Sequence, residues 1–197
     1  MRLIILTVCV VLAVVPKSAL AEKIKEILVF ENTKTTNATV LYLADLEVGD
    51  DYSDEVQERV RRDLISSGLF KEVEVLSEPH ELGGVKVTVL VKDKHSWIVA
   101  PTFYNQPTNR GAGVGFGENN LFGQNKKLLL YGQLATGDSF FIGAYVDPSI
   151  AQTRFHWQLD TFLRNERVFE YAPASAFLDN PEKLRQTKLR YLNVGST

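Results

Sequence analysis

The chain has 197 residues, of which 45% are hydrophobic and 23% charged, a balance that excludes a disordered chain and predicts one or two globular domains. Its formal net charge of -2 argues against nucleic acid as a partner. Residues 22–94 carry 10 Lys or Arg against 16 Asp or Glu, whereas residues 95–197 carry 10 against 8, which predicts a domain boundary near residue 95.

The first 21 residues have the pattern of a secretory signal peptide. A basic residue precedes an apolar run over residues 3–15, which is too short to span a bilayer. Ala19 and Ala21 form a small-x-small cleavage pattern, so Glu22 is the expected first residue of the mature chain. The alternative is a buried hydrophobic helix. The single cysteine, Cys9, lies inside this leader, so the mature chain is expected to have no disulfide and no thiol chemistry.

Residues 22–95 have the pattern of one small α+β domain in the order β-α-α-β-β. Two helices on one face of a three-stranded sheet suit a unit of this length. Ser53 suits the N-cap of the second helix, and Gly68 suits its C-terminal end. The expected elements are a strand at 23–30, a helix from Thr36 or Asn37 to Ala44, a helix after Ser53, and strands at 72–76 and 85–91.

The strand expected at 85–91 alternates valine with other residues and is therefore expected at the centre of the sheet. That arrangement leaves the strand at 72–76 at an edge, with unpaired backbone groups to which an extended client segment can add. The expected client-binding edge consists of Glu72, Val73, Glu74, Val75 and Leu76. The alternative is an edge that its own charged residues protect from pairing.

Residues 96–197 show no helical stripe and instead contain strand-length segments separated by turns. The expected strands are 97–104, 110–116, 126–136, 139–147, 153–164 and 187–194. The segment 153–164 alternates most clearly, with Phe155, Trp157 and Leu159 on one face and Arg154, His156 and Gln158 on the other. Strands of about 9–11 residues are long for a soluble sheet and suit a tilted strand in a membrane. We therefore expect antiparallel strands of a membrane β-barrel, with lipid on the apolar face.

Two motifs resemble a known family. Gly49-x-x-Tyr52-Ser53, with a helix that ends at 67–70, resembles a POTRA (polypeptide-transport-associated) domain. The segment 111–123 resembles the barrel start of bacterial surface antigens, the outer-membrane assembly and secretion factors of BamA or TamA type. The residues of this barrel-start motif are Gly111, Gly113, Gly115, Gly117, Asn120, Leu121 and Gly123.

The alternating glycines leave one face of their strand without side chains, so that the strand can bend or another segment can approach closely. A nucleotide-binding loop is disfavoured, because that fingerprint requires a different glycine spacing and a following helix, whereas residues 118–124 have a turn-like composition. His80, His95 and His156 show no metal-ligand spacing. Asp160 and Glu166 lie among arginines, which favours a charge network in the barrel lumen over acid-base catalysis. No catalytic residue, cofactor or metal site is therefore expected.

The resemblance implies a non-enzymatic factor in the bacterial outer membrane, with its POTRA-like domain in the periplasm. Its expected partners are unfolded outer-membrane or secreted polypeptides, outer-membrane lipid and accessory envelope proteins. The alternatives are a passive pore or surface antigen with a POTRA-like spacer, and a soluble two-module protein whose second half is a sandwich. Six expected strands are fewer than the ~8 of the smallest membrane barrels, so we expect an incomplete barrel, either a fragment or one part of an assembly.

Overall fold

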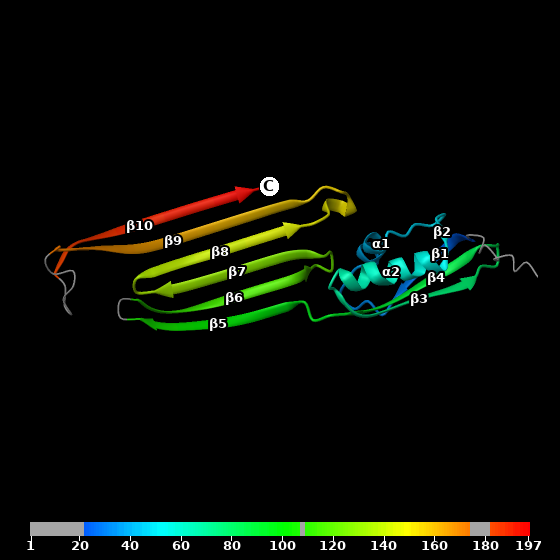
Figure 1. The fold of residues 1–197 in the computed structure, drawn as a ribbon, viewed down its shortest axis with the longest axis horizontal. Helices are drawn as coiled ribbons and strands as arrows, with labels where there is room; N and C mark the ends of the chain where they lie inside the picture. Colours follow the sequence, from blue (N-terminus) through cyan, green and yellow to red (C-terminus); the bar gives the residue numbers. More distant parts are fainter. Residues whose placement is uncertain (1–21, 107–108, 174–181) are drawn as a thin grey trace, which may run out of the picture.

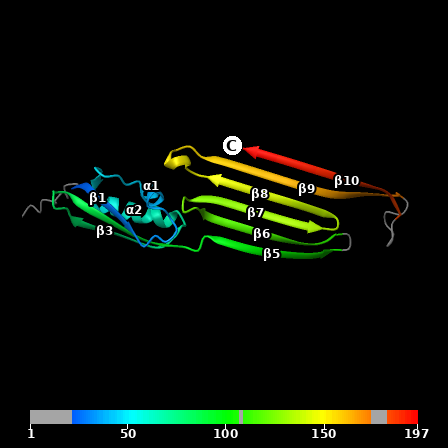
Figure 2. The same ribbon diagram turned by 180° about the vertical axis from the view of Figure 1, so that it is seen from behind.

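The computed structural model describes residues 22–106, 109–173 and 182–197, which form two sheets joined end to end (Figure 1). Residues 22–93 make an α+β unit, and residues 97–196 supply a six-stranded sheet. The same arrangement is visible from behind (Figure 2). The predicted signal peptide, with Ala19 and Ala21, lies outside the described residues and stays a prediction.

The α+β unit has the expected order of elements, with one additional short strand. Its elements are β1 (Glu22–Phe30), α1 (Asn37–Ala44), β2 (Asp51–Tyr52), α2 (Asp54–Ser66), β3 (Phe70–Pro79) and β4 (Val85–Asp93). The sheet order is β2-β1-β4-β3, so the expectation of three strands was one strand short. Sequence periodicity did not reveal β2, because two residues are too few to alternate.

Side-chain caps fix the starts of both helices. The Thr36 hydroxyl accepts a hydrogen bond from the Thr39 amide, and the Ser53 hydroxyl accepts one from the Val56 amide. A cap of this kind stabilises a helix by about 0.5–2 kcal/mol. After α2 the chain turns at Gly68, whose φ of +76° is left-handed and favours glycine. The Ser53 cap and the terminating glycine were expected from the sequence, and Thr36 was one of the two expected starts of the first helix.

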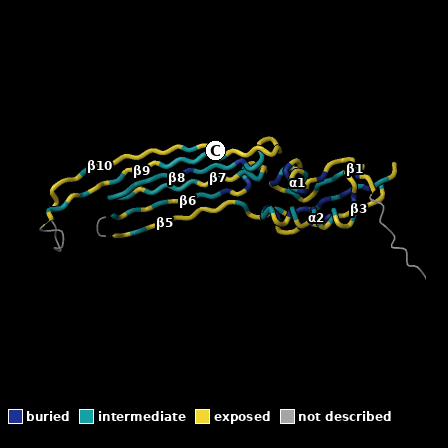
Figure 3. The backbone as a smooth tube through the Cα atoms, turned by 45° about the horizontal axis from the view of Figure 1, so that its top comes forward, coloured by how far each residue is buried: buried dark blue, intermediate teal, exposed yellow. Residues whose placement is uncertain are grey.

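The hydrophobic core lies entirely in the α+β unit, as the burial colouring in Figure 3 shows. Strand β4 lies between β1 and β3, which confirms the expected central position of residues 85–91. Its four valines at alternate positions are at most 7% exposed. They belong to the same buried cluster as Val60 and Leu64 of α2, so the sheet is covered by helices on one face.

The second half of the chain is one antiparallel sheet in chain order, β5 to β10. The strands are β5 (Trp97–Gln106), β6 (Asn109–Leu121), β7 (Lys126–Ala135), β8 (Asp138–Asp147), β9 (Trp157–Tyr171) and β10 (Lys183–Ser196). All six expected strands are present, with differences at their ends. Strand β9 continues to Tyr171, beyond its expected end at 164, and β10 begins at Lys183, before its expected start at 187. Strand β6 continues to Leu121, where a turn was expected, and β9 begins at Trp157, so that 153–156 lies in the preceding connection.

The pairing register gives this sheet two unlike faces. One, which we call the apolar face, carries Val99, Phe103, Val114, Phe116, Leu130, Leu134, Leu159, Leu163, Leu192 and Val194. Many of these side chains are exposed, among them Phe103 at 81% and Leu134 at 80%. The opposite face, which we call the glycine face, carries the alternating glycines of β6 and polar residues such as Gln133, Asp160 and Arg164. It also carries a row of aromatic rings, at Tyr131, Phe140, Phe162 and Tyr191. Among the described residues, neither helix has the length and apolarity needed to cross a bilayer.

Candidate functional site

The predicted client-binding residues lie on β3, at the outer edge of the small sheet. Strand β3 pairs only with β4, through an antiparallel register that includes Val73↔Val91 and Val75↔Val89. The Val73 and Val75 side chains are buried in the core, whereas Glu72, Glu74 and Leu76 are exposed on the uncovered face. The strand is thus fixed in place by its valines, with one long side open to pairing.

Part of this edge is already occupied by a side chain from α2. The Gln57 amide donates to the Val75 carbonyl at 2.8 Å, and its carbonyl oxygen accepts from the Tyr52 hydroxyl at 3.1 Å. In an antiparallel pair every second residue points its backbone groups away from the partner, so Val73 belongs with Val75 to the outward set. The open part of the edge is therefore its first half, from Phe70 to Glu74, next to the six-stranded sheet (Figure 1).

The glycines of β6 make room for tyrosines of neighbouring strands. A Cβ added at Gly113 would lie 2.8 Å from both the Tyr131 hydroxyl and Thr102 Oγ1, and one at Gly111 would lie 2.8 Å from the Tyr104 hydroxyl. The Thr102 and Tyr131 hydroxyls are themselves 2.8 Å apart in a hydrogen bond. Close approach to the bare strand, the expected reason for this spacing, is what the structure contains.

The rest of the barrel-start motif holds the α+β unit in place. Asn120 is 2% exposed, and its side-chain amide donates to the Thr35 hydroxyl at 2.8 Å. The Thr36 amide donates to the Gly123 carbonyl at 2.9 Å, and a Cβ at Gly123 would lie 2.1 Å from the Lys34 carbonyl oxygen. The turn between β6 and β7 thus receives the 33–36 segment that leads into α1. Leu121 closes β6 opposite Lys126.

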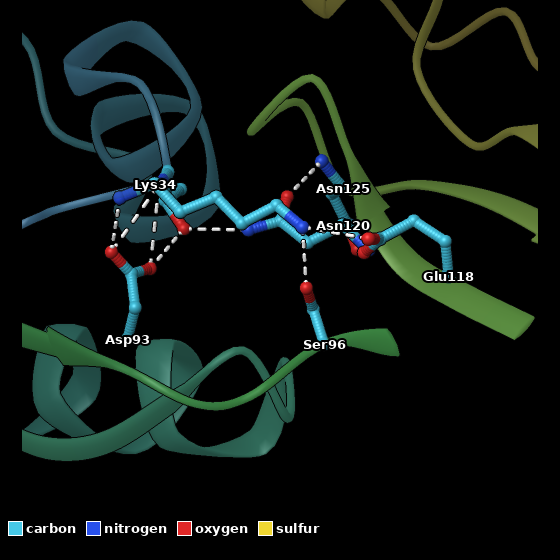
Figure 4. A network of polar contacts seen from close by, with 7 residues as sticks. Lys34, Asp93, Ser96, Glu118, Asn120 and Asn125 are labelled. Atoms are coloured by element: carbon cyan, nitrogen blue, oxygen red, sulfur yellow. Dashed lines mark hydrogen bonds and ion pairs between the residues drawn. The ribbon is translucent and has the colours of Figure 1, made fainter. Parts of the chain in front are cut away.

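We call the contacts between the 33–36 segment and the β6–β7 turn the junction. An ion pair and a hydrogen-bonded carboxylate complete it (Figure 4). Lys34 Nζ lies 2.7 Å from Glu118 Oε2 and 2.5 Å from Ser96 Oγ, and Glu118 Oε1 accepts from the Asn120 amide at 2.7 Å. Glu118 is only 8% exposed, so its charge depends on these partners. The network joins three segments that are far apart in sequence.

Asp93, the last residue of β4, holds the 33–35 segment from the opposite side. Burial raises the pKa of its carboxyl, but hydrogen bonds from the Thr35 hydroxyl and from the amides of Lys34, Thr35 and Thr33 outweigh burial and hold the pKa below its ordinary value. The carboxylate is therefore ionised in the folded chain and orders this segment. Sequence analysis missed Asp93 and Lys34, because their spacing along the chain follows no motif. Glu118 lies within the 111–123 motif, but the motif alone did not reveal its pairing with Lys34.

The open edges of the larger sheet are the other feature of interest. Within the described ranges, β5 pairs only with β6 and β10 only with β9, so each leaves one row of backbone groups unpaired. Strand β5 follows the junction directly, three residues after β4. An edge strand of this length is a template for pairing with another strand.

The described residues hold no group of three His, Cys, Asp or Glu side chains close enough to bind a metal ion. His156 lies in the connection before β9, so its expected position on a strand facing a lumen was wrong. Arg164 pairs with Asp138 at 2.8 Å and with Glu166 at 3.4 Å on the glycine face, whereas Asp160 accepts from the Gln158 amide at 2.7 Å. The expected charge network therefore centres on Arg164.

Comparison with known proteins relates this fold to solved structures. No protein-family description and no curated protein sequence matches the chain. BamA from Haemophilus ducreyi lacking POTRA domains 1–3 matches with a TM-score of 0.59 and 17% identity, over 85% of this chain and 31% of that chain. CdiB from Acinetobacter baumannii matches with a TM-score of 0.47 and 12% identity, over 79% of this chain and 30% of that chain.

The chain thus spans about a third of the length of the structures it matches. At these identities the likeness is evidence of fold, and only the first match is close enough in shape to carry an argument. The likeness to BamA supports one expectation from the sequence, namely that the chain consists largely of strands like those of the BamA barrel.

Proposed function

We propose that this chain is the first part of an outer-membrane factor that assembles or translocates polypeptides, with no enzymatic activity. The α+β unit is its POTRA-like domain and stands in the periplasm, and the six-stranded sheet is the start of its barrel. The observation that carries the proposal is the match to BamA over 85% of the chain. Residues 96–197 are only about half of the chain, so the match extends well into the α+β unit.

The two unlike faces of the large sheet support its place in a membrane. A soluble sheet buries its apolar face in a core, yet here large apolar side chains such as Phe103 and Leu134 are exposed. In a barrel the same side chains contact lipid, and the glycine face, with its polar residues and its row of aromatic rings, lines the lumen. Contact with lipid therefore explains why these apolar side chains are exposed, since their contact with water would be unfavourable.

The open edges suggest how a client is handled. An unfolded client segment adds to the first half of β3, where backbone hydrogen bonds give affinity with little demand on sequence. Strand β5 then offers a second open edge at the start of the barrel, where a client strand pairs before it enters lipid. Formation of the client's own hydrogen bonds and burial in lipid supply the free energy, so no nucleotide is needed.

Site-specific crosslinking in cells tests this role. A photoreactive residue in place of Glu74, on the exposed edge, should crosslink to unfolded outer-membrane polypeptides. The same residue in place of Glu58, on the surface of α2, is the matched control. Removal of 22–94 should abolish client capture and leave the chain in the membrane. Equal labelling from both positions, or capture that survives the deletion, would leave a passive pore with a spacer domain as the better description.

A further inference from the structure

Three cations gather on the apolar face at the end of the sheet farthest from the α+β unit. In the register of β9 and β10, Lys188 lies directly opposite Arg167, and Arg190 lies opposite Asn165. All four residues point to the same side as Leu163 and Leu192, because they are an even number of positions away. We call Arg167, Lys188 and Arg190 the cationic cluster.

The cluster is crowded, and no described carboxylate pairs with it. Neighbouring strands are about 5 Å apart and alternate residues about 7 Å apart, so the three side chains share one small area. Like charges directly opposite each other in a sheet are destabilising. Nowhere in the described ranges does a carboxylate come within ion-pair distance of the three; the nearby Asp138 and Glu166 pair with Arg164 on the glycine face.

A shallow hollow of about 380 Å³ lies beside these residues. Its lining includes the three cations, Asn165 and Ser139, which all project from the apolar face, together with residues 135–137. Glu166 and Leu189 also line it, from the glycine face, and the Glu166 carboxylate pairs with Arg164. The Ser139 hydroxyl already bonds to the Ala135 backbone, so the available groups are the three cations and the Asn165 amide. Such donors together bind the oxygens of a phosphate group.

The position of the cationic cluster on the apolar face indicates which kind of molecule carries the phosphate. Immediately toward the α+β unit, the same face carries the exposed Leu163 and Leu192 and the partly buried Phe141. On the far side of the cations, the same face carries the aromatic pair Phe169 and Tyr171. The face therefore changes from apolar to cationic within one residue pair. A molecule that covers both must have an acyl part and an anionic head, which is the chemistry of a lipid at a membrane surface.

We propose that the cationic cluster binds the phosphate groups of an anionic lipid headgroup in the outer leaflet of the membrane. The assignment to the outer leaflet rests on the proposed function, which puts the α+β unit, at the other end of the sheet, in the periplasm. The bound phosphate offsets the repulsion between Arg167 and Lys188, so the lipid stabilises the β9–β10 pair that carries it. The interaction belongs to the barrel wall and is separate from client binding at β3 and β5.

Lipid exchange into the full chain tests the proposal. The chain is reconstituted in phosphatidylcholine vesicles, and retention of labelled diphosphorylated lipid A is measured against its dephosphorylated form. Replacement of the cluster by Arg167→Gln, Lys188→Gln and Arg190→Gln should weaken retention by at least about tenfold, because hydrogen bonds between charged groups are the strong ones. The control variant, Arg62→Gln with Lys127→Gln and Arg185→Gln, removes as many charges away from the apolar face and should retain the lipid.

The other outcomes decide between the proposals. Retention by the cluster variant equal to that of the parent overturns the headgroup site, as does full displacement of the lipid by inorganic phosphate, which would make it a site for soluble anions. Extraction with alkaline carbonate separates this failure from that of the proposed function. A chain that stays embedded but does not retain the lipid refutes the headgroup site alone, whereas a chain that carbonate removes refutes the barrel and this site with it.

Discussion

Replacement of Gly123 by alanine should release the α+β unit from the larger sheet. Gly123 has a φ of +70°, and a Cβ there would lie 2.1 Å from the Lys34 carbonyl oxygen. Favourable nonbonded contacts begin near 3.5 Å, so the two backbones must separate by more than about 1 Å. That movement breaks the bond from the Thr36 amide to the Gly123 carbonyl, now 2.9 Å, and the bond between Asn120 and Thr35.

The size of the effect follows from these terms. Each of the two lost hydrogen bonds costs about 0.5–1.5 kcal/mol. An alanine held in the left-handed backbone conformation costs about 1–2 kcal/mol more. Docking of the 33–36 segment should therefore weaken by about 2–5 kcal/mol, which corresponds to at least about 30-fold, since 1.4 kcal/mol is a factor of ten. The core of the α+β unit should keep its stability, because none of its valines contacts Gly123.

Hydrogen exchange in detergent measures this change residue by residue. The Thr36 amide should lose at least about 30-fold protection in the Gly123→Ala variant, while the Val87 amide in the core should not change. Gly83→Ala is the matched control, because Gly83 has a φ of +78° but nothing within 4 Å of its added Cβ. If the Thr36 amide exchanges equally in the two variants, close packing at Gly123 does not hold the unit.

Three further predictions concern charge. The hydrogen bonds that lower the pKa of Asp93 stabilise the junction above the ordinary carboxyl pKa of about 3.9, and this stabilisation is lost as the pH falls through the folded-state value. Pepsin, which cleaves beside aromatic residues, should therefore cut next to Phe30, where this segment begins, only below about pH 4 in the parent. Asp93→Asn should remove that pH dependence; a cleavage profile unchanged by the substitution would contradict it. Lys34→Met should loosen the junction more than Glu118→Gln, by about 1–3 kcal/mol, because it leaves a buried carboxylate without its cation, whereas Lys34 is 34% exposed and can reach water. Hydrogen exchange of the Thr36 amide, measured over a range of urea concentrations, compares the two variants. Equal effects would show that the two charges act independently. Val194→Arg should impair membrane incorporation by about 2–4 kcal/mol, whereas Asn193→Arg, on the opposite face, should change it little; similar incorporation of both variants in a vesicle flotation assay would argue against lipid on the apolar face.

The sequence was sufficient for features that depend on local pattern. Alternation predicted all six strands of the larger sheet and the central place of the valine strand at 85–91. Side-chain chemistry predicted the caps at Thr36 and Ser53, because a hydroxyl that precedes a helix has a specific partner in its first turn.

The junction was beyond prediction from one sequence. Lys34 and Glu118 lie 84 positions apart and meet only because β4 runs through three residues into β5, which pairs with β6. Asn120 and Gly123 were identified through a family motif, yet their contacts with 33–36 depend on where the first unit docks. The predicted strand ends were wrong for a related reason. Strand β6 continues to Leu121 because Leu121 pairs with Lys126, whereas the residues around this turn, taken alone, predict a loop.

The junction also explains why the two open edges keep a defined relation to each other. Strand β4 supports the β3 edge on one side and continues into the β5 edge on the other, so the orientation of the connecting residues 94–96 sets the angle between them. The contacts that fix this orientation are directional polar bonds to Asp93, Glu118 and Asn120, and the described residues leave no buried side-chain polar atom without a partner. Fully satisfied polar networks specify geometry more than they add stability. In the proposed function, a client moves between two edges whose separation the junction sets, so a loosened junction should slow transfer while both edges still bind.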